Sequence, residues 1–232
     1  GVQTCALPIF DPTGLTAGMV EYAVWAVMRY HRHIDVYERF QREGTWKKLP
    51  IPDTARRGVG ILGLGEIGGA CAQALSAFGF PVAGWSRTPK NLDGIISYAG
   101  VEGLKPFLAR TDILVCVLPL TAATRGIINA ELLAALPKGA FVINIARGGH
   151  VVDSDLIAAL DSGHIAGATL DVFQPEPLPP EHPFWRHPKV TVTPHVASLT
   201  NPETAALPIV ENLRRLAAGQ KLLHLVDRAS GY

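Results

Sequence analysis

The chain has 232 residues, of which 48% are hydrophobic and 18% charged, and its mean hydropathy is +0.21. This composition excludes a disordered tail and a coiled coil, and the length suffices for a domain with a sizeable core. Lys and Arg number 21 against 20 Asp and Glu, so the net charge of +1 gives no field that would attract nucleic acid. The most apolar stretch is interrupted by Glu21, Arg29, His31 and Arg32. No run therefore reaches the roughly 18 apolar residues of a membrane span, and we expect neither a nucleic-acid nor a membrane partner.

The cysteines and the first residues bear on the compartment. Cys5, Cys71 and Cys116 are odd in number and have no Cys-x-x-Cys spacing, which argues against a disulfide framework and against a zinc site. The histidines have no metal-ligand spacing either, so we predict no metal. The first ten residues lack the basic region of a signal peptide. We expect buried thiols in a reducing, cytoplasmic protein.

The first nine residues, GVQTCALPI, resemble the translated read-through of a sequencing adapter. We therefore expect residues 1–9 to be a non-native segment. The chain from Phe10 onward would then be the tail of a longer protein.

A helical pattern occupies residues 14–43. Apolar or aromatic side chains recur there at three- and four-residue spacing, at Val20, Ala23, Val24, Val27, His31, Ile34 and Tyr37. The pattern predicts one helix of roughly 40 Å. Aromatic side chains also lie off this stripe, at Tyr22 and Trp25. We interpret the segment as a helix that bridges domains or forms a dimer, with an ordinary core helix as the alternative.

Short apolar runs alternate with helical segments in the rest of the chain. Strands are predicted at 59–62, 82–85, 113–118, 141–145, 167–172 and 190–193, and most of them are continuously apolar. Helices are predicted at 67–78, 103–109, 130–136 and 154–161, the last capped by Asp153, with a final helix at 202–219. This alternation predicts an α/β fold with a doubly wound parallel sheet.

A glycine-rich turn follows the first predicted strand. Gly63, Gly65 and Gly68 form a Gly-x-Gly-x-x-Gly pattern that opens a helix. In a dinucleotide site the first glycine permits the tight turn, the second lets the backbone approach a pyrophosphate, and the third allows close packing of helix on strand. The N–H groups of Glu66 and Ile67 would then face the anion. The alternative, a glycine turn without a ligand, is disfavoured by the flanking strand and helix.

The segment after the second predicted strand bears on the choice of cofactor. An NAD site would place an Asp or Glu there for the ribose hydroxyl, and none is present. The segment instead offers donors and positive charge at Ser86, Arg87, Thr88 and Lys90. These groups suit a 2′-phosphate, so we predict NADPH as the preferred cofactor and NADH as possible. The alternative is a solvated basic turn.

Four polar side chains follow the later strands, where ligands bind in open α/β sheets. They are Arg147, Asp171, Glu176 and His195. Arg147 suits a carboxylate, and His195, held by Glu176, suits proton exchange near neutrality. Asp171 would accept a hydrogen bond from the nicotinamide carboxamide. Together they fit hydride transfer to a 2-oxo acid. The alternative is that Arg147 forms a surface ion pair, His195 is an ordinary loop histidine and Glu176 is a solvated acid.

Several motifs in this order resemble the D-isomer-specific 2-hydroxyacid dehydrogenase family. They are the glycine turn, Ala146-Arg147-Gly148, Leu170 to Phe173 with Glu176 to Pro179, and Thr193 to Ala197. Trp85 to Thr88, residues 178–181 and the ending 226–232 resemble the glyoxylate/hydroxypyruvate reductase A branch more closely. The resemblance covers residues 10–232.

This resemblance implies Arg147, Glu176 and His195 as the catalytic set, with His195 as the acid and base. It implies further cofactor contacts from Leu118, Pro119, Thr124, Ile145 and Ala146, and counts Arg147 and His195 among the cofactor contacts as well. It also implies a homodimer that reduces glyoxylate to glycolate and hydroxypyruvate to D-glycerate with NADPH.

One departure from the family is large, because its members carry a substrate domain before the long helix. We therefore expect residues 10–197 to be an NADP-binding Rossmann domain and residues 198–232 to be the C-terminal remnant of a second, substrate domain. The chain as written should bind NADPH but turn over poorly, because Arg147 alone does not position a substrate. Reduction of a different 2-oxo acid, or a non-catalytic NAD(P)-sensing module, are the alternatives.

Overall fold

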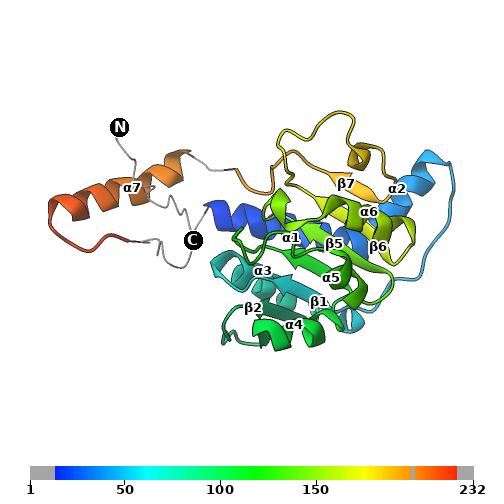
Figure 1. Ribbon diagram of the computed structural model, residues 1–232, viewed down its shortest axis with the longest axis horizontal. Coiled ribbons are helices and arrows are strands. Elements are labelled where there is room, and N and C mark those ends of the chain that lie inside the picture. Colours follow the sequence, from blue (N-terminus) through cyan, green and yellow to red (C-terminus); the bar gives the residue numbers. More distant parts are fainter. Residues whose placement is uncertain (1–13, 200–201, 224–232) are drawn as a thin grey trace.

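The computed structural model describes residues 14–199 and 202–223 (Figure 1). The segment predicted to be non-native, 1–9, lies outside the described residues, as does Cys5. The end of the predicted tail, residues 224–232, also lies outside them.

The centre of the fold is a sheet of seven strands in the order β3-β2-β1-β4-β5-β6-β7, all parallel. The strands are β1 Val59–Leu62, β2 Val82–Ser86, β3 Ile96–Ala99, β4 Ile113–Cys116, β5 Ala140–Asn144, β6 Ile165–Leu170 and β7 Val190–Val192. The predicted parallel sheet is confirmed. The edge strand β3 was not predicted, because its four residues are partly exposed and carry no continuous apolar run.

Helices cover both faces of the sheet. They are α3 Glu66–Ala77, α4 Gly100–Leu108, α5 Ala130–Ala135 and α6 Asp153–Asp161, together with α1 Gly14–His31. One core cluster joins α1 and α3 to alternate residues of the strands, and a second joins α4, α5 and α6 to the others. The domain is therefore doubly wound, as predicted. Short 3₁₀ helices occupy Thr54–Arg56, Gly148–His150 and Pro183–Trp185.

The predicted helix over 14–43 is wrong as a single element. The structure divides it into α1 and α2 Ile34–Arg42. His33 between them takes a left-handed φ of 58°, which ends the regular turns without a glycine or proline to signal it. The guanidinium of Arg29 then donates two hydrogen bonds to the carboxylate of Glu38, at 2.5 and 2.7 Å, and fixes α2 against α1. Apolar periodicity continues through this break, so it could not reveal it.

A smaller correction concerns the start of α6. Asp153 is the first helical residue and Val152 precedes it, so no side chain caps this helix. The carboxylate of Asp153 instead lies 3.3 Å from His182 Nε2.

The last described helix is α7, Pro202–Ala217, which extends away from the sheet in Figure 1. Large apolar side chains on it are exposed, at Leu207, Leu213 and Leu216. The assignment of 198–232 to a second domain stays a prediction. Within the described ranges no helix has the length and apolar character that crossing a membrane requires.

Candidate active site

The glycine turn follows β1, which lies between β2 and β4 in the sheet. The strand order reverses between β1 and β4. The N–H of Gly63 donates to the carbonyl of Trp85 at 2.8 Å, which joins the turn to the end of β2. Gly63 has a φ of +115°, a conformation that side chains disfavour. Switch points of this kind are where open α/β sheets bind ligands.

Two glycines of the turn differ in the space around them. A Cβ on Gly68 would lie 1.7 Å from the carbonyl oxygen of Gly63, so this position is closed by the protein's own backbone. A Cβ on Gly65 would meet nothing within 4 Å. Gly65 precedes α3, whose first N–H groups, from Glu66 and Ile67, have no partner within the helix. The open space and these donors fit a pyrophosphate.

The segment that was predicted to hold a 2′-phosphate lies beside this turn, because β1 and β2 are paired. Arg87, Thr88 and Lys90 are exposed there. The Ser86 side chain differs, since it is 8% exposed and its hydroxyl donates to the Thr88 carbonyl at 2.7 Å. Ser86 thus shapes the turn, and the cationic side chains beside it suit a phosphate group.

The loop after β4 closes the other side of the glycine turn. Leu118 is nearly buried there, and its main-chain nitrogen lies 3.1 Å from where a Cβ on Gly63 would stand. The Thr124 hydroxyl donates to the Pro119 carbonyl at 2.7 Å and so holds this loop in shape. Ile145, after β5, is buried, and its N–H donates to the Cys116 carbonyl at 3.3 Å. The predicted cofactor residues therefore lie around one edge of the sheet, and their contacts to a cofactor stay predictions.

The turn that carries Arg147 is anchored by two buried polar residues that the sequence reading missed. Asn144, at the end of β5, donates to the Arg147 carbonyl at 3.0 Å and accepts from the N–H of Ala146 at 3.2 Å. His150 Nδ1 lies 3.0 Å from the same carbonyl. Both side chains are fully buried. A polar residue in the apolar run Phe141 to Ile145 was the signal that could have revealed Asn144.

Arg147 itself is exposed, and its Nη1 donates to the Ala146 carbonyl at 2.6 Å. The next residue, Gly148, packs tightly, because a Cβ there would lie 1.9 Å from the carbonyl carbon of Phe173. This close approach brings the Arg147 turn against the loop that carries Glu176. The remaining N–H groups of this exposed guanidinium suit a carboxylate.

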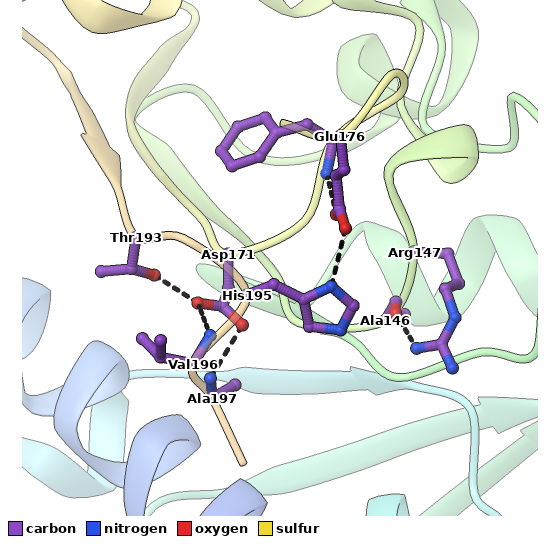
Figure 2. A network of polar contacts seen from close by, with 9 residues as sticks. Ala146, Arg147, Asp171, Glu176, Thr193, His195, Val196 and Ala197 are labelled. Carbon is purple, nitrogen blue, oxygen red and sulfur yellow. Dashed lines mark hydrogen bonds and ion pairs between the residues drawn. The ribbon is translucent and has the colours of Figure 1, made fainter. Parts of the chain in front are cut away.

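Glu176 and His195 come together as the sequence analysis expected. His195 Nδ1 lies 2.8 Å from Oε2 of Glu176, and Oε1 of Glu176 accepts from the N–H of Phe173 at 2.8 Å (Figure 2). With Nδ1 directed at Glu176, Nε2 is the ring nitrogen available to a substrate. The His195 side chain is 48% exposed, so a small molecule can reach it.

The contacts of the Glu176 carboxylate change its pKa. Partial burial raises its pKa, but the hydrogen bonds from His195 and from the Phe173 N–H outweigh that effect and lower the pKa below its usual value. The nearby charge of Arg147 acts in the same direction. The carboxylate is therefore ionised at neutral pH and can orient the imidazole.

Asp171 has a role that the sequence reading did not foresee. Its side chain is fully buried. One carboxylate oxygen accepts from the Thr193 hydroxyl at 2.5 Å and from the Val196 N–H at 2.9 Å, and the other accepts from the Ala197 N–H at 2.8 Å (Figure 2). Asp171 thus fixes the turn on which His195 stands. The predicted contact to the nicotinamide carboxamide stays a prediction.

The hydrogen bonds around Asp171 extend through Thr193 to Tyr22 on α1. The Tyr22 hydroxyl lies 2.6 Å from Oγ1 of Thr193, which in turn donates to Asp171. Burial raises the pKa of Tyr22 to about 12, so its hydroxyl keeps its proton. The long N-terminal helix therefore buttresses the turn that carries His195.

Titratable groups elsewhere do not form a metal centre in the portion of the chain that is described, where no three His, Cys, Asp or Glu side chains gather. Cys71 and Cys116 are free, buried thiols. Burial raises the pKa of each to about 12, which makes them unreactive near neutral pH.

A comparison with protein families decides the classification. Residues 24–197 match the model described as D-isomer specific 2-hydroxyacid dehydrogenase, NAD binding domain. The chain belongs to this family. The glycine turn, the Arg147 turn and the Glu176–His195 pair all lie within the matched residues, so the family signal and the site geometry coincide.

Curated relatives agree. The chain is 46% identical over 234 aligned residues to glyoxylate/hydroxypyruvate reductase A of Yersinia enterocolitica, which covers all of this chain and 75% of that protein. It is 47% identical over 229 residues to the protein of the same name from Salmonella heidelberg, covering 98% of this chain and 73% of that one. The chain therefore spans about three quarters of the length of these relatives.

Solved structures match over most of the fold. A D-isomer specific 2-hydroxyacid dehydrogenase from Xanthobacter autotrophicus, in complex with NADPH and MES, superimposes with a TM-score of 0.92 at 51% identity and covers 94% of this chain and 90% of that one. The NADPH-dependent glyoxylate/hydroxypyruvate reductase of Sinorhizobium meliloti, in complex with NADP and sulfate, gives 0.91 at 41% identity, covering 94% and 71%. Both structures therefore share the fold over most of this chain.

Proposed function

We propose that this protein is an NADPH-dependent reductase of small 2-oxo acids, which converts glyoxylate to glycolate and hydroxypyruvate to D-glycerate. The observation that carries the proposal is the Glu176–His195 contact on the same sheet edge as Arg147 and the glycine turn. Supporting it, the relatives from Yersinia and Salmonella are named for this activity.

The choice of NADPH rests on two features. The exposed segment Arg87 to Lys90 follows β2 and carries two cationic side chains and no acid, which suits a 2′-phosphate. The similar structures from Xanthobacter and Sinorhizobium hold NADPH or NADP. We propose the open space at Gly65 for the pyrophosphate and the Arg87 turn for the phosphate on the ribose.

Arg147 would bind the substrate carboxylate. Its guanidinium is exposed on a turn held by buried Asn144 and His150, so its direction is limited although its tip reaches solvent. A planar guanidinium pairs with a carboxylate through two parallel hydrogen bonds. Its positive charge would also polarise the adjacent carbonyl as negative charge develops on the oxygen.

His195 would supply the proton. NADPH, when bound, supplies the hydride that adds to the carbonyl carbon of the 2-oxo acid. The oxygen of that carbonyl takes the proton from Nε2 of His195, giving the 2-hydroxy acid, and solvent returns a proton to the ring. Glu176, ionised and fixed by Phe173, holds the Nδ1–H and stabilises the protonated imidazole.

Three further parts of the proposal concern the whole protein. We propose a homodimer, supported by Trp25 on α1, which is 43% exposed despite its size. We propose a cytoplasmic location, in keeping with the buried free thiols. We also expect the 232-residue chain alone to bind NADPH but to turn over slowly, because one guanidinium does not fix the carbonyl in line for hydride transfer.

The test is the oxidation of NADPH, and separately of NADH, by the protein expressed from its complete gene, with glyoxylate and hydroxypyruvate offered one at a time. We expect rapid oxidation of NADPH with both acids, slower oxidation of NADH, and D-glycerate as the product from hydroxypyruvate. Tight binding of NADPH without oxidation in the presence of either acid would contradict the proposal. If NADPH is oxidised only when a bulkier 2-oxo acid is offered, that acid is the substrate. If no 2-oxo acid supports oxidation of NADPH, a non-catalytic sensing module is favoured.

A further inference from the structure

His150 is a fully buried histidine that the proposed chemistry does not use. It ends the short 3₁₀ helix Gly148–His150, directly after Arg147. Its ring stands between two main-chain carbonyls, because Nδ1 lies 3.0 Å from the oxygen of Arg147 and Nε2 lies 3.3 Å from the oxygen of Pro119. Pro119 is 31 residues away in the chain and belongs to the loop that follows β4.

We propose that His150 is a positioning residue, whose ring holds the Arg147 turn and the Pro119 loop at a fixed separation. The inference rests on the proposed function, in which Arg147 binds the 2-oxo acid and the Pro119 loop borders the cofactor. Each contact then has a distinct consequence. The contact at Nδ1 orients the substrate site, and the contact at Nε2 orients the cofactor site.

Other hydrogen bonds stabilise each loop within itself. The Asn144 side chain donates to the Arg147 carbonyl at 3.0 Å, and the two residues are three apart. The Thr124 hydroxyl donates to the Pro119 carbonyl at 2.7 Å, and those residues are five apart. The ring of His150 contacts both carbonyls and thereby joins one loop to the other.

Main-chain bonds run beside this contact but reach a different part of the loop. The N–H of Gly126 donates to the carbonyl of Gly149 at 2.8 Å, and the N–H of Ile128 donates to the carbonyl of His150 at 2.8 Å. They fix the segment that leads into α5. Pro119, which lies before the 121–125 turn, is tied to the Arg147 turn through the imidazole.

The two contacts can be separated by substitution. A neutral imidazole has one N–H, so it donates to one carbonyl at a time, whereas the protonated ring donates to both. Burial lowers the pKa of His150, and the charges of Arg147 and Arg125 add to that effect against the opposing hydrogen bonds. An asparagine places its amide nitrogen near the position of Nδ1, and a glutamine places it near the position of Nε2.

The experiment compares His150→Phe, His150→Asn and His150→Gln with the unmodified protein from the complete gene. The matched control is His164→Phe. His164 is also a histidine that contacts a main-chain carbonyl 31 residues away, with Nε2 3.0 Å from the oxygen of Leu133. It precedes β6 and so lies at the opposite edge of the sheet. The readouts are kcat, KM for glyoxylate, and Kd for NADPH from cofactor fluorescence.

We expect His150→Phe to raise both KM for glyoxylate and Kd for NADPH. The constant that depends on the carbonyl bonded to the ring N–H should rise about tenfold, the order of one lost hydrogen bond, and the other constant should rise less. His150→Asn should restore KM but not Kd, and His150→Gln should restore Kd but not KM. His164→Phe should leave both constants unchanged. If His150→Phe does not fold, the opposite responses of the asparagine and glutamine variants decide the question.

The inference is overturned if the three variants lower thermal stability while KM and Kd stay as in the unmodified protein, or if His164→Phe shifts the constants equally. Its failure is distinct from failure of the proposed function. If the unmodified protein reduces no 2-oxo acid, two measurements still test whether His150 connects the two loops. They are Kd for NADPH and the amide hydrogen exchange of residues 118–124 and 147–151. The inference is supported if both segments exchange faster in His150→Phe and if residues 118–124 return to slow exchange in His150→Gln. Unchanged exchange refutes the inference.

Discussion

Nδ1 of His195 lies 2.8 Å from Oε2 of Glu176, and the backbone of His195 has a left-handed φ of 57°. Such a conformation costs a non-glycine residue about 1–3 kcal/mol and persists only where the surroundings impose it. Here Asp171 imposes it. Its main-chain carbonyl accepts from the N–H of His195 at 2.8 Å, and its carboxylate holds the next two N–H groups, of Val196 and Ala197. The ring is therefore aimed by the turn as well as by Glu176.

Asp171→Asn tests this account of the turn. An amide replaces one accepting oxygen by a donor, which then faces the N–H of Val196 or of Ala197 and cannot pair with it. We expect the free energy of unfolding to fall by about 2 kcal/mol, measured by urea denaturation, and kcat to fall with it. The control is Asp161→Asn, because that side chain is 68% exposed. Equal stability of the two variants would contradict the role given to Asp171.

Glu176→Gln tests the orientation of the imidazole. Glutamine keeps a contact to His195 but removes the negative charge that stabilises the protonated ring. We expect kcat to fall about 100-fold with little change in KM, which steady-state kinetics measures. Glu181→Gln, at an exposed acid five residues further along the loop between β6 and β7, should retain full activity. A similar loss in both variants would point to the loop instead of the contact.

The lowered pKa of Glu176 also predicts how stability depends on pH. Because the folded pKa lies below the unfolded value of about 4.3, the carboxylate adds stability above about pH 4.3. That contribution is lost as the pH falls through the lower folded value. The unmodified protein should thus be more stable than Glu176→Gln at about pH 6, and the difference should shrink at about pH 3. A constant difference would show that ionisation is not involved.

Gly65→Ala and Gly68→Ala separate the space for a cofactor from the packing of the turn. A Cβ on Gly65 meets nothing within 4 Å, so the thermal midpoint should stay unchanged while NADPH affinity falls at least tenfold. A Cβ on Gly68 would collide with the Gly63 carbonyl, so this variant should lose stability as well. Thermal melts and fluorescence titrations measure the two effects. Unchanged NADPH affinity in Gly65→Ala would remove the pyrophosphate from this position.

Arg87→Asp tests the preference for NADPH. Reversing the charge beside a 2′-phosphate should weaken NADPH binding about 10- to 100-fold, the size of a lost charge-assisted hydrogen bond, and weaken NADH binding much less. Lys138→Asp, at an exposed site before β5 on the other edge of the sheet, is the charge-matched control. If the ratio of the two affinities does not change in Arg87→Asp, recognition of the phosphate lies elsewhere.

The sequence could predict the parts of this fold that depend on local pattern. Buried strands such as β1 and β4 show as continuous apolar runs, and the glycine turn shows because the positive φ of Gly63 and the close backbone approach at Gly68 require glycine. The edge strand β3 escaped because pairing on one side leaves Ile96 48% exposed and removes the apolar signal. The break at His33 escaped because it depends on Arg29 and Glu38 meeting across the turn.

The site divides in the same way. Residue type and position after a strand indicated Arg147, Glu176 and His195, and the structure brings Glu176 and His195 into contact. The residues that hold them were not foreseen, because the contact of Tyr22 with Thr193 spans 171 positions and that of His150 with Pro119 spans 31. Such pairings follow from the tertiary fold, and no local pattern encodes them.

The most direct test of the central claim is the rate of NADPH oxidation by His195→Ala with glyoxylate, measured with the protein from its complete gene and alongside its Kd for NADPH. A proton donor that is removed costs typically 10²- to 10⁴-fold in rate. The account predicts a loss of that size in kcat with a far smaller change in Kd for NADPH, because the proposed phosphate contacts lie at the glycine turn and the Arg87 turn, whereas His195 lies on the turn after β7. Turnover by His195→Ala at the rate of the unmodified protein would contradict it.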